Sequence, residues 1–137
     1  MSHTCKAALV RCMDFRLDPE LTDYVRSQNL LHDIDVISIA GAAKNIVDDP
    51  QGFVMTQIGL SVKLHEITEV HLMHHSDCGA YGGSRMFASL EEEKAMHIEQ
   101  MQKAKEVIST SYPSLTVLMF FAVIGENQHI SFVEKVG

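Results

Sequence analysis

Apolar residues along the chain fall into short continuous runs that alternate with longer segments of helical periodicity. Short runs rich in apolar or β-branched residues are typical of buried strands, and longer periodic segments are typical of helices. Strands are therefore predicted at 6–13, 35–41, 69–77 and 115–124. Helices are predicted at 18–30, which begins with an Asp-Pro pair, at 49–67 and at 89–109. After a Gly-Glu-Asn turn at 125–127, the segment 129–136 allows an antiparallel edge strand.

Two of the predicted helices differ in how their apolar residues are distributed. The helix at 49–67 is apolar around much of its circumference, so we expect it to be buried on more than one side. The helix at 89–109 is amphipathic, with three glutamates at 91–93 in its first turn, where the helix dipole favours them. We expect its lysine and glutamate clusters to form a solvated face.

This alternation of strands and helices predicts an α/β fold, an open and mostly parallel sheet with helices on both faces. Right-handed crossovers and short connections favour the strand order 2-1-3-4, with the possible antiparallel strand at the edge. In that order the first and third strands are neighbours, and the chain leaves them in opposite directions. Such a switch point is where open sheets bind ligands, so the ends of 6–13 and 69–77 should face each other.

Both of these strand ends carry residues that can bind metal. Cys12 lies at the end of the first strand, and His75 and Cys78 lie at the end of the third. Two thiolates and one imidazole are the donors of a zinc site that keeps one position open. Asp14 and Arg16 follow Cys12 at a spacing of two, so on an extended segment all three side chains point the same way. We expect Arg16 to hold Asp14 ionised and away from the metal.

The donor set also predicts a pH range for any activity. Two thiolates donate more charge than three histidines, so zinc here is a weaker Lewis acid. Its bound water should ionise above the value of roughly 7 that is found in three-histidine sites. Activity should therefore rise toward alkaline pH. Loss of Arg16 should allow Asp14 to become the fourth ligand.

Length and composition exclude several classes of function. The chain has 137 residues, which we interpret as one domain over 1–137, and a net charge of −7, which argues against binding to nucleic acid or to anionic membranes. Its longest apolar run, 115–125, is too short to span a bilayer. The start of the chain lacks the pattern of a secretory signal, so we expect a cytoplasmic location with reduced thiols. An odd count of three cysteines also disfavours a disulfide framework.

Several other polar residues near these motifs receive simpler interpretations. Cys5 has no partner at ligand spacing and is expected to be a plain thiol. His74 is expected to be a packed or solvated strand residue, and Asp77 to bond backbone in its turn. Tyr81 and Arg85 remain alternatives for lining a pocket or an anion site.

The two motifs Cys12-x-Asp14-x-Arg16 and His75-x-x-Cys78 together resemble the signatures of the β-class carbonic anhydrases. The segment 39–45, IAGAAKN, lies where that family has an Ala-Gly turn, and the order of elements matches over nearly the whole chain. The resemblance is closest to the short archaeal- and bacterial-type members, which lack a long amino-terminal helical arm.

The resemblance implies zinc bound to Cys12, His75 and Cys78, an Asp14–Arg16 dyad, and attack of zinc hydroxide on carbon dioxide to give bicarbonate. It also implies a homodimer or higher homo-oligomer with the active site near the subunit interface. The largely apolar helix at 49–67 fits such an interface.

Two departures from the family pattern leave alternatives open. Phe15 replaces a small serine, and Ser38-Ile39 stands where many members carry Arg-Asn. Both changes leave the metal ligands intact but are expected to alter the lining of the pocket. Hydrolysis of carbon disulfide or carbonyl sulfide by the same chemistry is therefore one alternative. A non-catalytic protein with structural zinc or a bicarbonate-sensing pocket is another, whereas the absence of a Cys-x-x-Cys pair disfavours a redox role.

Overall fold

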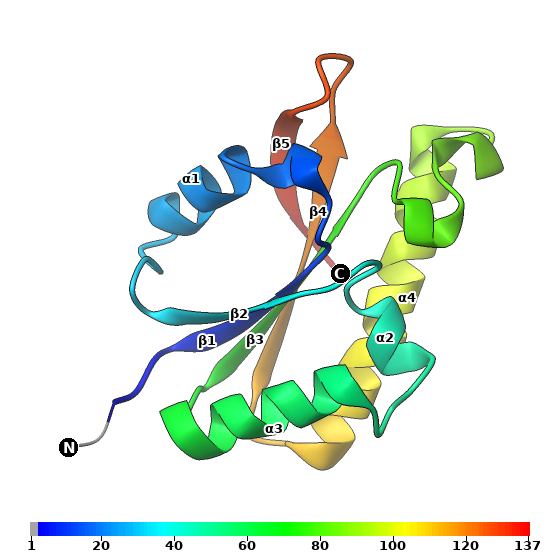
Figure 1. The fold of residues 1–137 in the computed structure, drawn as a ribbon. Helices are drawn as coiled ribbons and strands as arrows, with labels where there is room; N and C mark the ends of the chain where they lie inside the picture. The colour runs from blue at the N-terminus through cyan, green and yellow to red at the C-terminus, as the bar shows by residue number, and fades with distance from the viewer. Residues whose placement is uncertain (1–2) are drawn as a thin grey trace.

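The computed structural model describes residues 3–137, and within them five strands form one sheet in the order β2-β1-β3-β4-β5 (Figure 1). The first four strands are parallel, and β5 pairs with β4 in the antiparallel sense. The predicted order 2-1-3-4 and the antiparallel edge strand are therefore confirmed. The strands are β1 (Ala7–Arg11), β2 (Ile34–Ser38), β3 (Glu69–His75), β4 (Thr116–Ile124) and β5 (Ile130–Val136).

Helices cover both faces of this sheet, as predicted (Figure 1). Successive residues of β1 point to opposite faces, so Val10 packs in the cluster with α2, α3 and α4, whereas Leu9 packs with α1. The α-helices are α1 (Glu20–Ser27), α2 (Lys44–Val47), α3 (Phe53–His65) and α4 (Leu90–Ser111). Short 3-10 helices are η1 (Phe15–Leu17), η2 (Gly79–Tyr81) and η3 (Ser84–Met86). Among the helices of residues 3–137, none has both the length and the apolar character needed to cross a membrane.

The ends of the elements differ from the predicted ends for identifiable backbone reasons. The strand predicted at 35–41 ends at Ser38, because Gly41 adopts a φ of 81° and starts a turn. A Cβ atom at Gly41 would lie 2.9 Å from the Cβ of Ala80, so this turn approaches the loop after β3 closely. The turn leads into α2, which was not predicted. The helix predicted at 49–67 is shorter and ends where Glu66 adopts a φ of 54°.

Two predictions about burial differ from the burial seen within a single chain. Helix α3 buries only one side, and Phe53, Leu60 and Leu64 on it are 63%, 42% and 55% exposed. Glu93 of α4 is buried rather than solvated, because its carboxylate accepts hydrogen bonds from the backbone N–H of Asp77 (2.7 Å) and from the Ser84 hydroxyl (2.8 Å). Helix α4 thus anchors the loop that follows β3.

A buried pair of histidines joins α4 to β3. His74 Nε2 accepts a hydrogen bond from the backbone N–H of Ala43 (3.1 Å), so its proton is on Nδ1 and is donated to His97 Nδ1 (2.8 Å). His74 is therefore a packed residue, one of the two states predicted for it. Burial first, and then nearby histidines, lower the pKa of both rings, well below 6.5 for His74 and from 6.5 to about 4 for His97.

This pair predicts a loss of stability in weak acid. In the unfolded chain both histidines bind protons as the pH falls through 6.5, but in the folded chain His97 resists protonation until about pH 4, and the lowered pKa of His74 acts in the same direction. Stability should therefore be greatest above pH 6.5 and should fall by roughly 1–3 kcal/mol as the pH approaches 4.

The substitution His97→Asn keeps an acceptor for His74 but cannot be protonated. It should lower stability at neutral pH and flatten the decrease between neutral and acidic pH, as measured by urea unfolding. His32→Asn is the control, because His32 is exposed and asparagine tolerates its φ of 65°, and it should keep the wild-type slope. Equal slopes in wild type and His97→Asn would contradict this assignment.

Candidate metal centre

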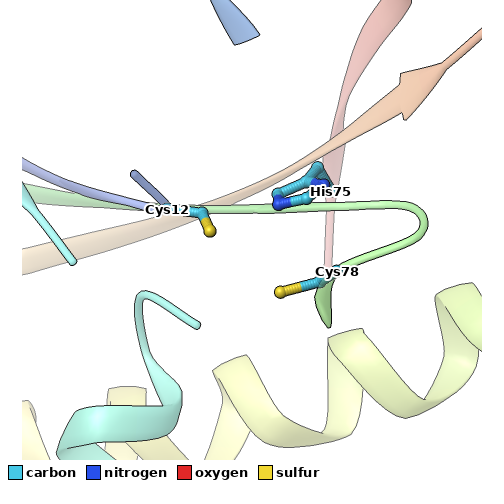
Figure 2. Close-up of side chains that lie close together, drawn as sticks. All are labelled: Cys12, His75 and Cys78. Carbon is cyan, nitrogen blue, oxygen red and sulfur yellow. The ribbon is translucent and has the colours of Figure 1, made fainter. Parts of the chain in front are cut away.

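The structure brings Cys12, His75 and Cys78 together at the carboxyl ends of β1 and β3 (Figure 2). Parallel pairing of these strands places Arg11 opposite Met73, so the residues that follow both strands lie at one edge of the sheet. The two sulfurs and a ring nitrogen of His75 all lie within 4.8 Å of one another. All three residues are buried. Figure 2 shows the two sulfurs and the imidazole arranged around one small space.

The hydrogen bonds of His75 leave one ring nitrogen available for a metal. Its Nδ1 lies 2.7 Å from the backbone carbonyl oxygen of Ser76 and donates to it. Its Nε2 is then the unprotonated nitrogen, and it is buried with no hydrogen-bond partner among residues 3–137. A buried acceptor without a partner costs free energy, and a metal ion between this nitrogen and the two sulfurs would satisfy it. The donor set and its orientation thus fit zinc.

The surroundings of the two sulfurs favour thiolates. A hydrogen bond from Cys78 lowers the pKa of Cys12, and backbone N–H groups of Gly41 and Asp14 act in the same direction. The contact with Cys12, together with burial, raises the pKa of Cys78. The first proton is therefore lost easily and the second only when a cation compensates the charge. The three cysteines within the described residues are all free thiols, which agrees with the predicted lack of a disulfide framework.

Asp14 lies beside this cluster and is fixed by Arg16. The guanidinium donates from Nε to Oδ1 (3.0 Å) and from Nη2 to Oδ2 (2.7 Å), and the backbone N–H of Arg16 also donates to Oδ1 (2.8 Å). Asp14 Oδ2 lies 3.9 Å from His75 Nε2. These hydrogen bonds from Arg16 lower the pKa of Asp14 to about 2. The pairing of Asp14 with Arg16 was predicted, but its geometry differs, since Asp14 caps η1 and the segment is not extended.

Asp77 also belongs to this hydrogen-bond network, which the sequence analysis did not predict. It bonds backbone as expected, since Ser84 N–H donates to its Oδ1 (2.8 Å), but its Oδ2 also accepts from Arg16 Nη1 (2.9 Å). Arg16 Nη2 further donates to the carbonyl oxygen of Asp77 (2.9 Å). Arg16 therefore lies between two carboxylates and joins the loops after β1 and β3. The position of Asp77 between two candidate ligands was the only signal for this role in the sequence.

Two hollows lie beside Arg16, and their lining shows where Arg85 and Tyr81 lie relative to it. One, of about 500 Å³, is lined by Asp14, Asp77 and Arg85 among others, and the second, of about 460 Å³, includes Phe87. Arg85 thus lines a pocket, which was one of the two roles considered for it in the sequence analysis. Tyr81 does not line either hollow, and its ring packs instead against His74 and His97.

Phe15 and the Ser38-Ile39 turn do not shape these hollows in the way that the sequence suggested. The side chain of Phe15 is 86% exposed and, within the described residues, lines neither hollow beside Arg16. Ile39 packs against the core, and its backbone N–H donates to the carbonyl oxygen of Arg11 (3.0 Å). Neither Phe15 nor Ile39 therefore lines the two hollows beside Arg16.

Comparison with known proteins gives a family for this chain. A family model described as "Putative carbonic anhydrase" matches residues 2–134. Uncharacterized proteins of Rickettsia conorii and Rickettsia bellii are each 29% identical to this chain over 119 residues, which is 82% of this chain. The matched segment is 64% of the R. conorii protein and 73% of the R. bellii protein, so this chain spans less than two thirds of the former.

Solved structures show the same fold. The β-carbonic anhydrase isoform I of Trichomonas vaginalis matches with a TM-score of 0.67 and 13% identity, over 98% of this chain and 83% of that chain. A β-carbonic anhydrase of Sordaria macrospora, one of two that are described as tetrameric, matches with a TM-score of 0.56 and 18% identity. The match covers 99% of this chain and 82% of the S. macrospora chain. From the match over residues 2–134, together with this fold, we conclude that the chain belongs to the carbonic anhydrase family and has the β-class architecture.

Proposed function

We propose that the protein catalyses the zinc-dependent, reversible hydration of carbon dioxide to bicarbonate, with zinc held by Cys12, His75 and Cys78. The observation that carries this proposal is the buried, unpartnered Nε2 of His75, which faces two sulfurs and lies 3.9 Å from an ionised carboxylate of Asp14. Membership of the carbonic anhydrase family supports the choice of reaction.

The proposed roles of the protein side chains follow from their hydrogen bonds. When bound, zinc supplies Lewis acidity that ionises water near neutral to alkaline pH. Asp14 is ionised and can only accept hydrogen bonds. It therefore accepts one from the attacking water, which turns a lone pair of the water oxygen toward the substrate. Arg16 occupies both oxygens of Asp14 and thereby keeps that carboxylate from binding the metal.

The surroundings of Arg16 support the same reaction and its anionic product. Asp77 holds the outer side of the Arg16 guanidinium, so the Asp14–Arg16 pair is positioned before substrate arrives. Arg85 and Arg16 offset the charges of Asp14 and Asp77 in the hollow that all four line, so an anion such as bicarbonate meets no net negative charge there. The alternative sulfur substrates, carbon disulfide and carbonyl sulfide, would use the same metal chemistry, and the exposed Phe15 lines neither hollow beside Arg16.

We further infer that copies of this chain associate through β2 and α3. Strand β2 is at the edge of the sheet, where it leaves one side without a strand partner among the described residues. Val36 of β2 is 57% exposed, and it lines a shared hollow of about 260 Å³ with the exposed Leu60 and Leu64 of α3. Exposed apolar side chains gathered at a strand edge favour burial against a second copy.

The first prediction concerns the dependence of turnover on metal and pH. Zinc-loaded protein should hydrate carbon dioxide at a rate that rises from neutral to alkaline pH, because the two thiolate donors would place the ionisation of the attacking water above roughly pH 7. Asp14, with its pKa of about 2, is ionised throughout this range and adds no titration of its own. Stopped-flow measurement with a pH indicator tests this. Cys12→Ala should lose the ion of this centre and the activity, whereas Cys5→Ala should stay active. Full zinc occupancy at this site without turnover at any pH would refute the proposal.

The second prediction concerns Arg16. Arg16→Ala should keep zinc but lose turnover by on the order of 100-fold, because Asp14 is then free to bind the metal. Cobalt substitution should show the added oxygen ligand as a changed absorption spectrum. Arg26→Ala removes an exposed Arg–Asp pair, with both side chains at least 60% exposed, and should change neither property. Wild-type turnover in Arg16→Ala would show that the Asp14–Arg16 pair is not required.

The third prediction concerns the proposed interface. Leu60→Lys together with Leu64→Lys should reduce the mass measured by light scattering to that of a monomer, since charged side chains there oppose burial. Phe132→Lys is a matched control, because Phe132 is 51% exposed on β5 at the opposite edge of the sheet. A mass unaffected by the double substitution, or reduced equally by the control, would place the interface elsewhere.

A further inference from the structure

A second group of metal-binding side chains lies at the opposite end of the sheet. The sulfur of Cys5, a carboxylate oxygen of Asp35 and a ring nitrogen of His65 all lie within 4.8 Å of one another. Cys5 precedes β1 and Cys12 follows it, so the two groups are roughly 20 Å apart at about 3.3 Å per strand residue. This group is therefore separate from the candidate centre described above, and the sequence spacing of Cys5 gave no sign of it.

Three elements hold these side chains in place. The backbone N–H of Cys5 donates to the carbonyl oxygen of His65 (3.0 Å), which ties the amino-terminal segment to the end of α3. Asp35 is on β2 opposite Ala8 of β1. Its Oδ2 accepts a hydrogen bond from the Ser61 hydroxyl (2.5 Å) and lies 2.6 Å from His65 Nδ1. Ser61 and His65 are one helical turn apart on α3, so both reach the same carboxylate.

The chemistry of this group suits a divalent ion with affinity for sulfur and nitrogen. Although burial raises the pKa of Asp35, hydrogen bonds from Ser61 and His65 lower it overall, so this carboxylate is ionised. Burial and the nearby Asp35 raise the pKa of the Cys5 thiol, so its proton would be lost only when a cation compensates the charge. One carboxylate and one thiolate would then balance the charge of a divalent ion, and neutral imidazole would complete three ligands. The side chains of Asp35 and His65 are 31% and 29% exposed, so an ion can reach them from solvent.

Further histidines surround the same position. His3 and His32 line a hollow of about 240 Å³ together with Cys5, Asp35 and His65. The ring of His3 lies 5.0 Å, centroid to centroid, from the ring of His65. Both imidazoles line the hollow but lie outside the three-residue group whose donor atoms are all within 4.8 Å of one another. Thiol, imidazole and carboxylate donors together favour zinc over magnesium or calcium, which prefer oxygen alone.

We propose that Cys5, Asp35 and His65 form a second zinc site, which fastens the amino-terminal segment to β2 and α3. This site goes beyond the hydration reaction and does not depend on it. Its ion would be structural, because the three ligands come from three separate elements and no counterpart of the Asp14–Arg16 pair lies among the described residues of the group.

Metal titration in a background that lacks the first centre tests the proposal. The chain, without an affinity tag, carries Cys12→Ala and Cys78→Ala and is titrated with cobalt after chelator treatment. We expect one equivalent to bind with a thiolate-to-cobalt charge-transfer band and to raise the melting temperature. Adding Cys5→Ala should abolish the band and the thermal shift. Adding Asp35→Asn, which preserves shape, should weaken binding at least tenfold.

Controls separate this site from adventitious binding and from the proposed activity. Adding His129→Asn removes an exposed histidine outside the group and should leave cobalt binding unchanged. In the wild-type background, Cys5→Ala should lower zinc content from two ions to one per chain while carbon dioxide hydration persists. No saturable cobalt binding in the double-alanine background, or binding that survives both Cys5→Ala and Asp35→Asn, would overturn the second site and leave the first proposal intact.

Discussion

The parallel pairing of β1 with β3 is the constraint on which the candidate metal centre depends. It places Cys12 beside the end of β3, and the alternation of side chains along β3 then gives His74 and His75 opposite directions. His75 faces the sulfurs, whereas His74 packs against His97 beneath α4. A register shift of one residue would exchange these two histidines and dismantle both the cluster and the buried pair.

A single arginine joins the two loops that leave these strands. Arg16 lies between the carboxylates of Asp14 and Asp77, and Glu93 of α4 holds the backbone of Asp77 from the other side. The loop after β3 therefore has a fixed position relative to the loop after β1. In the proposed mechanism this rigidity matters because Asp14 must stay close to the metal ligands without becoming one of them.

The sequence predicted the parts of this molecule that depend on periodicity and on strand order. Alternating runs gave the sheet order, and that order alone was enough to bring Cys12 to His75 and Cys78. Contacts made by turns were harder to foresee, because the link from Asp77 to Arg16 depends on a left-handed residue at 77, with a φ of 58°. The exposed side of α3 was also missed, since an apolar helix surface looks the same whether the chain itself or another copy covers it.

Side chains that come together from distant segments could not be predicted from the sequence, for a different reason. Cys5, Asp35 and His65 are each thirty residues apart and belong to no spacing motif, so only the packing of α3 against β2 brings them together. Glu93 was likewise classed with its exposed neighbours, because the loop that buries it comes from β3.

The central claim is that Cys12, His75 and Cys78 hold zinc at the switch point. Anomalous diffraction at the zinc edge, from crystals of zinc-loaded protein, tests it most directly. The account predicts a peak bonded to both sulfurs and to His75 Nε2, with Asp14 held by Arg16 outside bonding distance. Full occupancy of zinc elsewhere, with no peak among these three side chains, would contradict the account.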